Sequence, residues 1–96
     1  MTTLELVSKH FQVDKRLLVN EGLLAFLQKK KSEILRDRIA IFAKYNIMGS
    51  SKELENLIKK GKIPEHPAWE DLITLENIDN ELEVIADDIR RIQKTR

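Results

Sequence analysis

Carboxylates are the most numerous side chains in this sequence that could do chemistry. Nine of them, with no Lys or Arg among them, lie between residues 65 and 89: Glu65, Glu70, Asp71, Glu76, Asp79, Glu81, Glu83, Asp87 and Asp88. Acid–base catalysis needs two such groups to converge on one substrate proton. The adjacent pairs Glu70–Asp71 and Asp87–Asp88 would point in different directions on a helix. We therefore interpret the acidic row as a solvated or partner-facing surface and predict no catalytic residue.

Metal, cofactor and nucleophile chemistry have few candidates. The chain has no Cys and only two histidines, His10 and His66, which have no other metal-ligating residues at suitable spacing. Structural zinc sites use four nitrogen or sulfur ligands. No Gly-rich phosphate loop or nucleophile-elbow motif is present. The sequence thus predicts a protein that is not an enzyme and that has no metal site and no cofactor.

The composition predicts an all-α fold with few, long helices. The 96 residues suit a single domain (1–96), apolar residues make up 42%, and Gly and Pro together number only five. No segment resembles a secretory leader or a membrane span, and a secreted protein of this size would usually need disulfides. These features favour a cytoplasmic protein without a membrane partner.

Helical periodicity and capping signals predict four helices, at about 3–11, 15–45, 51–60 and 67–94. Asp14 suits the N-cap of the second helix, which should end near Asn46–Gly49, with Gly49 as a natural C-terminal stop. Ser50 and Glu53 have the spacing of a capping box. One apolar strip of the second helix includes Leu17, Leu24, Leu27, Ile34, Ile41 and Met48.

The fourth helix has the clearest pattern, an apolar seam spaced 3, 4, 3, 4, 3. Its members are Leu75, Ile78, Leu82, Ile85, Ile89 and Ile92. Such a heptad seam is typical of coiled-coil packing. It can face another helix of the same chain or form the seam of a dimer.

The charge distribution favours a long antiparallel hairpin of the second and fourth helices, with the two short helices at its ends. This arrangement would set Arg38 near Glu76 and the run Lys29–Lys31 near Glu83. Exposed ion pairs of this kind contribute only about 0.2–1 kcal/mol each, but they favour one orientation. The alternative is that the acidic helix meets a basic partner, and the two explanations are compatible. A two-helix hairpin buries little core, so we also expect a homodimer.

Trp69, the single tryptophan, begins the fourth helix and has two interpretations. It can staple this helix to the hairpin, or it can anchor an interface, because Trp is enriched among binding hot spots.

A separate group of candidate binding residues is basic: Lys15, Arg16 and the Lys and Arg residues between positions 29 and 38. They could contact phosphates, but the acidic helix would offset them, so nucleic-acid binding is the less favoured function. The short first helix, the break at 13–15 and the segment 18–27 together look like the helix pair of ribbon-helix-helix proteins, without a preceding DNA-reading strand.

The later half of the chain resembles small helical antitoxin-like proteins of prokaryotic toxin–antitoxin operons. Tyr45, the segments 50–55 and 65–72, and Leu75-Glu76-Asn77 carry the resemblance, which covers residues 14–90. It implies a non-enzymatic protein that neutralises or regulates a partner, such as a nearby-encoded toxin, by binding it. The expected partner-binding residues are Trp69, Glu70, Asp71, Glu76, Asp79 and Glu83. The alternative function is that of a self-associating coiled-coil structural or adaptor protein.

Overall fold

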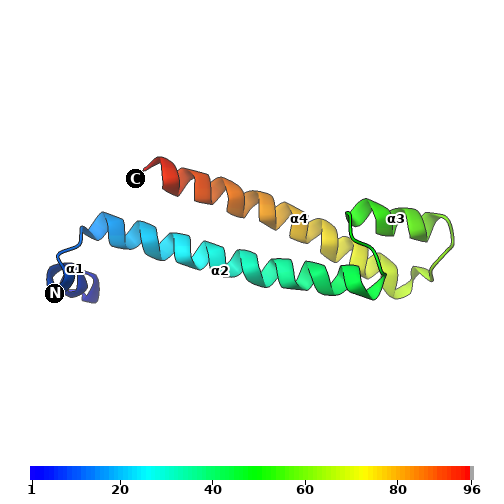
Figure 1. Cartoon of the computed structure of the whole chain (residues 1–96), viewed down its shortest axis with the longest axis horizontal. Coiled ribbons are helices and arrows are strands. Elements are labelled where there is room, and N and C mark those ends of the chain that lie inside the picture. Colours follow the sequence, from blue (N-terminus) through cyan, green and yellow to red (C-terminus); the bar gives the residue numbers. More distant parts are fainter. Residues whose placement is uncertain (96) are drawn as a thin grey trace.

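The protein is an all-helical hairpin, as the sequence predicted. The computed structural model describes residues 1–95. Its elements are α1 (Thr3–Phe11), α2 (Lys15–Lys44), α3 (Ser51–Lys59) and α4 (Glu65–Lys94). The long helices α2 and α4 lie side by side and antiparallel, α3 covers the turn between them, and α1 lies across the far end (Figure 1). The molecule is a rod of 62 × 22 × 18 Å.

The register between α2 and α4 is constant along the hairpin. Three cross-helix contacts define it: Lys44 to Asp71 at 2.9 Å, Arg38 to Asp79 at 3.1 Å, and the Asn20 amide to the Thr95 hydroxyl at 3.3 Å. In each pair the two residue numbers add up to between 115 and 117. The pairing of residues between the two helices therefore does not shift from the turn to the chain ends.

The main core lies at the turn, where three helices meet. Leu54 and Ile58 of α3 pack with the α4 residues Ala68, Leu72 and Leu75, and with Phe42 and Ile47. Leu54 and Leu75 are completely buried. A second, smaller cluster continues along the hairpin, with Ile34 of α2 against Ile78 and Ile85 of α4. Helix α3 therefore supplies a third layer that only one end of the hairpin has.

Three of the helices end in the same way, with a residue in the left-handed region followed by two backbone hydrogen bonds to the last turn. The left-handed residues are Gln12 (φ 53°), Asn46 (φ 54°) and Gly61 (φ 68°). After α2, the Asn46 and Ile47 amides donate to the Ala43 and Phe42 carbonyls at 3.2 and 3.0 Å. This is the Schellman motif, and the buried pair Ile47 and Phe42 supplies its hydrophobic contact.

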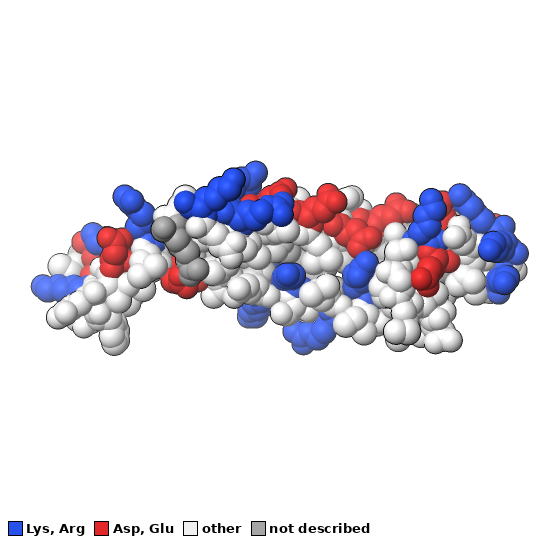
Figure 2. Space-filling view, turned by 45° about the horizontal axis from the view of Figure 1, so that its top comes forward, with Lys and Arg blue, Asp and Glu red and all other residues white. Residues whose placement is uncertain are grey.

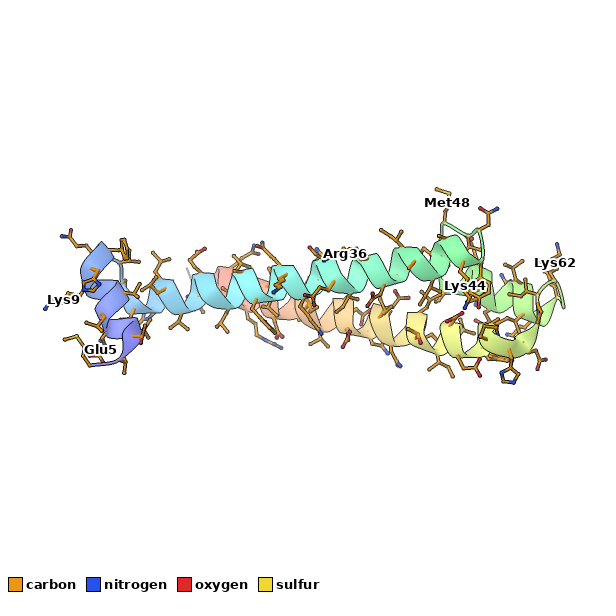
Figure 3. All side chains as sticks on the ribbon, turned by 90° about the horizontal axis from the view of Figure 1, so that it is seen from below. Glu5, Lys9, Arg36, Lys44, Met48 and Lys62 are labelled. Carbon is orange, nitrogen blue, oxygen red and sulfur yellow. The ribbon has the colours of Figure 1, made fainter. Side chains whose placement is uncertain are left out.

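The predicted end of this helix near Asn46–Gly49 is confirmed at Asn46, whereas Gly49 is not the residue that stops it. Helix α2 ends at Lys44, because Asn46 adopts the left-handed conformation there without needing a glycine. Met48, placed by the sequence in the apolar strip of α2, lies beyond this stop and is 92% exposed. Figure 3 shows it pointing away from the body of the molecule. Leu17, at the other end of the same strip, is also exposed.

Two N-caps were predicted, and one is present. The Asp14 carboxylate accepts from the backbone amides of Arg16 at 2.7 Å and Leu17 at 3.4 Å. The capping box of Ser50 and Glu53 is wrong, because the Ser50 side chain makes no capping hydrogen bond. Instead, the Ser50 carbonyl accepts from the Glu53 amide at 3.1 Å, in a 3₁₀-type turn that begins the helix.

At the start of α4, His66 departs from helical geometry (φ −108°, ψ 132°), so regular helix begins at Pro67, where the sequence predicted it. Within residues 1–95, no helix combines the length and the apolar character that crossing a bilayer requires.

Candidate protein-binding surface on α4

The apolar seam of α4 faces α2 within the same chain. Leu75, Ile78 and Ile85 are buried, and Leu82 and Ile89 pack against the same cluster. Ile92, the last residue of the seam, is half-buried near the end of the hairpin. The seam therefore belongs to the core of the hairpin, and any partner of α4 must meet a different face.

A second row of side chains runs along the outer face of α4, with the spacing 4, 3, 4, 3, 4. We call it the outer stripe, and its members are Trp69, Ile73, Glu76, Asn80, Glu83 and Asp87. All six are exposed. At 3.6 residues per turn this spacing keeps them on one face of the helix. The outer stripe begins with two apolar residues and continues with polar and acidic ones.

Trp69 is 39% exposed at the beginning of the outer stripe. The neighbouring core positions are held by Ala68 and Leu72, which are 1% and 2% exposed. Trp69 therefore lies at the edge of this core and not within it, and its interpretation as the staple of α4 stays a prediction. Trp69 and Ile73 together form an apolar patch on an otherwise polar face.

Asp71 was expected on the partner surface, but it is used inside the protein. Its carboxylate accepts from Lys44 Nζ at 2.9 Å and from the Tyr45 hydroxyl. Figure 3 shows Lys44 reaching from α2 toward α4. Burial alone would raise the pKa of Asp71, but the hydrogen bonds from Lys44 and Tyr45 outweigh it and lower that pKa. Burial, followed by the bond to Asp71, raises the pKa of Tyr45 to about 12.

Asp79 is also used inside the protein, in an ion pair with Arg38 of α2 (3.1 Å). The Arg38 guanidinium also lies over the Phe42 ring, 4.7 Å from its centre. The expected pairing of Arg38 with Glu76 is therefore wrong by three residues, or about one helical turn. The reason is that Leu75 and Ile78 orient α4, which turns Asp79 toward α2 and Glu76 away from it.

Three other acidic residues pair locally with residues of α4 itself. Glu70 lies 2.8 Å from His66 Nδ1, Asp88 lies 2.7 Å from Arg91, and Asp87 pairs with Arg90. The pKa of Glu70 is lowered, first by a backbone hydrogen bond and then by the bond with His66. These exposed pairs contribute little to the stability of α4, because water screens the charges.

Four acidic residues of α4 have no ion pair within residues 1–95: Glu65, Glu76, Glu81 and Glu83. The expected pairing of Glu83 with the run Lys29–Lys31 is therefore wrong, because Glu83 lies on the outer stripe. In Figure 2 the acidic side chains form a band along α4 that ends in basic groups near the C-terminus. Ion pairs between α2 and α4 thus explain why Asp71 and Asp79 are acidic, but they do not explain the other acidic residues between positions 65 and 89.

The six predicted partner-binding residues accordingly divide into two groups. Trp69, Glu76 and Glu83 lie together on the outer stripe, whereas Asp71 and Asp79 bind α2, and Glu70 binds His66. Sequence reasoning missed Ile73, Asn80 and Asp87. The signal was present, because these three residues continue the heptad spacing that Trp69, Glu76 and Glu83 begin.

Comparisons with known proteins gave one match. Neither the curated proteins nor the solved structures contain a match to the chain. A family sequence model matches residues 1–96, over the whole length of the chain. The chain therefore belongs to the family described as "Uncharacterized protein MJ0235".

Proposed function

We propose that this protein is a non-enzymatic binding module of the antitoxin type, which neutralises or regulates a partner protein through the outer stripe of α4. The observation that carries this proposal is the stripe itself. It joins an exposed tryptophan and an isoleucine to two acidic residues, Glu76 and Glu83, that have no ion pair within residues 1–95. Nothing in the hairpin accounts for these side chains, since the opposite face of α4 forms the core.

The chemistry of the outer stripe defines the partner that would fit it. Trp69 and Ile73 suit an apolar pocket, and buried aromatic anchors provide much of the binding energy in protein interfaces. The acidic residues suit a basic rim, which would speed association and select the right partner. Toxins that act on nucleic acids have basic surfaces of this kind, which agrees with the antitoxin resemblance of residues 14–90.

The test is co-expression of the full chain with the product of the adjacent gene, followed by co-purification and titration calorimetry. We expect a complex of defined stoichiometry. Trp69→Ala should weaken it about thirtyfold, since loss of a hot-spot side chain costs about 2 kcal/mol or more. The double variant Glu76→Lys/Glu83→Lys should weaken it further and slow association at low salt.

The control is Asp37→Lys, which makes the charge change of each of these two substitutions once, at an exposed position of α2. It should leave the affinity unchanged. The proposal fails if the neighbouring product does not bind, or if the Trp69 and Glu76/Glu83 variants bind as tightly as the control.

A further inference from the structure

The chain exposes much more surface than a compact protein of the same mass. Its accessible surface is 7,202 Å², whereas a compact monomer of 11.2 kDa exposes about 5,700 Å². Its radius of gyration is 19.4 Å, against about 12.5 Å for a compact domain of this length. The excess of about 1,500 Å² exceeds the roughly 800 Å² that each partner contributes to a standard interface. A second copy could therefore cover a full interface here.

One apolar groove between α2 and α4 is suited to this role, and it lies on a flank separate from the outer stripe. Phe26 lies at its centre and is 64% exposed, with Leu23 and Val84 exposed on either side. Two adjoining hollows of about 350 and 240 Å³ share Phe26 and Leu27 as lining residues. Exposed phenylalanine, leucine and valine grouped in this way are typical of an interface.

The two rims of this groove carry one unpaired charge of each sign. Lys30 lines it from α2, and Glu81, Asp88 and Arg91 line it from α4. Arg91 already pairs with Asp88 at 2.7 Å, so Glu81 is the acidic group of this rim that has no ion pair within residues 1–95. A two-fold axis parallel to the long axis of the rod would lay α2 of each copy over α4 of the other. In a symmetric dimer every contact occurs twice, so Lys30 of each copy would face the α4 rim of the other, where Glu81 is the acidic group without an ion pair within residues 1–95. A two-fold axis across the rod would instead set α2 on α2, with like charges facing.

We propose that the Phe26 groove binds a second copy of this chain, forming a four-helix bundle in which each α2 packs on the partner's α4. The dimer leaves the outer stripe of α4 free, so it does not depend on the function proposed above. The hydrophobic seam of Leu75 to Ile92 remains inside each chain. The dimer is thus built on residues that the sequence did not single out for it.

Sedimentation equilibrium of the full chain alone tests the proposal. We expect a dimer, and we expect Phe26→Glu to raise its dissociation constant about a hundredfold, because a charge would enter the apolar groove. The matched control is Ile39→Glu, since Ile39 is equally exposed (64%) on α2 but lines a different hollow, near Met48. A monomeric wild-type chain, or a dimer broken by the Ile39 variant and not by the Phe26 variant, overturns the proposal.

A second experiment tests the charge arrangement. Lys30→Glu and Glu81→Lys alone should each weaken the homodimer roughly tenfold, because each places two pairs of like charges across the interface. When the two single variants are mixed, both pairs become complementary and the heterodimer should regain the wild-type affinity. Circular dichroism of each variant separates this result from misfolding. Failure of the mixture to form heterodimers, with both variants folded, contradicts the arrangement.

Discussion

The two ends of the hairpin are built differently from the same two helices. At the closed end, residues 34–78, α3 adds a third layer, and nine of the eleven buried apolar residues in the described part of the chain lie there. At the open end, residues 1–33 and 79–95, only Leu24 and Ile85 are buried. Helix α1 lies at that end, but none of its residues is buried.

The difference shows where a short chain can complete a core and where it cannot. Two helices alone contact each other along one face, so their flanks stay exposed unless a third element covers them. At the closed end, Leu54 and Ile58 of α3 provide this cover. At the open end, Phe26 and Val84 remain exposed. The closed end is therefore expected to hold the monomer together, and the open end to change most when a partner binds.

The largest effect is expected from shortening a core side chain at the closed end. Leu75→Ala should lower the free energy of unfolding by about 2–5 kcal/mol, because Leu75 is completely buried and its loss leaves a cavity. Ile89→Ala, in the same seam but half-buried at the open end, should cost less than half as much. Urea unfolding at one fixed protein concentration measures both. Equal losses would contradict the contrast between the two ends.

A smaller effect is expected from the polar cluster at the closed end. Asp71→Asn removes the charge that Lys44 and Tyr45 contact and should cost about 1–3 kcal/mol at neutral pH. The folded-state pKa of Asp71 is lowered, so its stabilisation is present above the unfolded-state pKa and is lost as the pH falls through the folded-state value. Thermal melts from neutral to acidic pH should therefore show a weaker pH dependence in the variant.

Tyr45→Phe provides the control at the other end of the pH range. The pKa of Tyr45 is raised from 10.0 to about 12, so its contribution is present below pH 10 and is lost as the pH rises toward 12. The Phe variant should lose this alkaline dependence and keep part of the acidic one, because Lys44 still contacts Asp71. An unchanged alkaline profile would mean that the Tyr45 hydroxyl does not bind Asp71.

The smallest effect is expected at the open end, from Gly22→Ala. Gly22 lies within α2, and an added Cβ there would meet no atom within 4 Å. The substitution should stabilise the protein by about 0.5–1 kcal/mol, since alanine loses less backbone entropy in a helix. Hydrogen exchange should slow for the neighbouring amides of α2 and stay unchanged in α3. Slowing at both ends would indicate that the hairpin opens as one unit.

Sequence reasoning predicted the elements of this fold well and its side-chain partners less well. The four helices, the cap at Asp14 and the seam from Leu75 to Ile92 all follow from local periodicity and composition. The stop at Gly49 was wrong because Asn46 can take up the left-handed conformation that glycine was expected to supply. The expected partner of Arg38 was wrong by about one turn, because the packing of Leu75 and Ile78, and not ion pairing, orients α4.

The sequence by itself determined that the chain is helical, where its helices begin and end to within a few residues, and which side of α4 is apolar. These properties depend on residues one to four positions apart in the chain, so the sequence alone contains the information that sets them. Only the tertiary structure decided which acidic residues are internal. Once Leu75 and Ile78 pack against α2, rotation of α4 about its axis is fixed. That rotation turns Asp71 and Asp79 inward and leaves Trp69, Glu76 and Glu83 on the outer stripe.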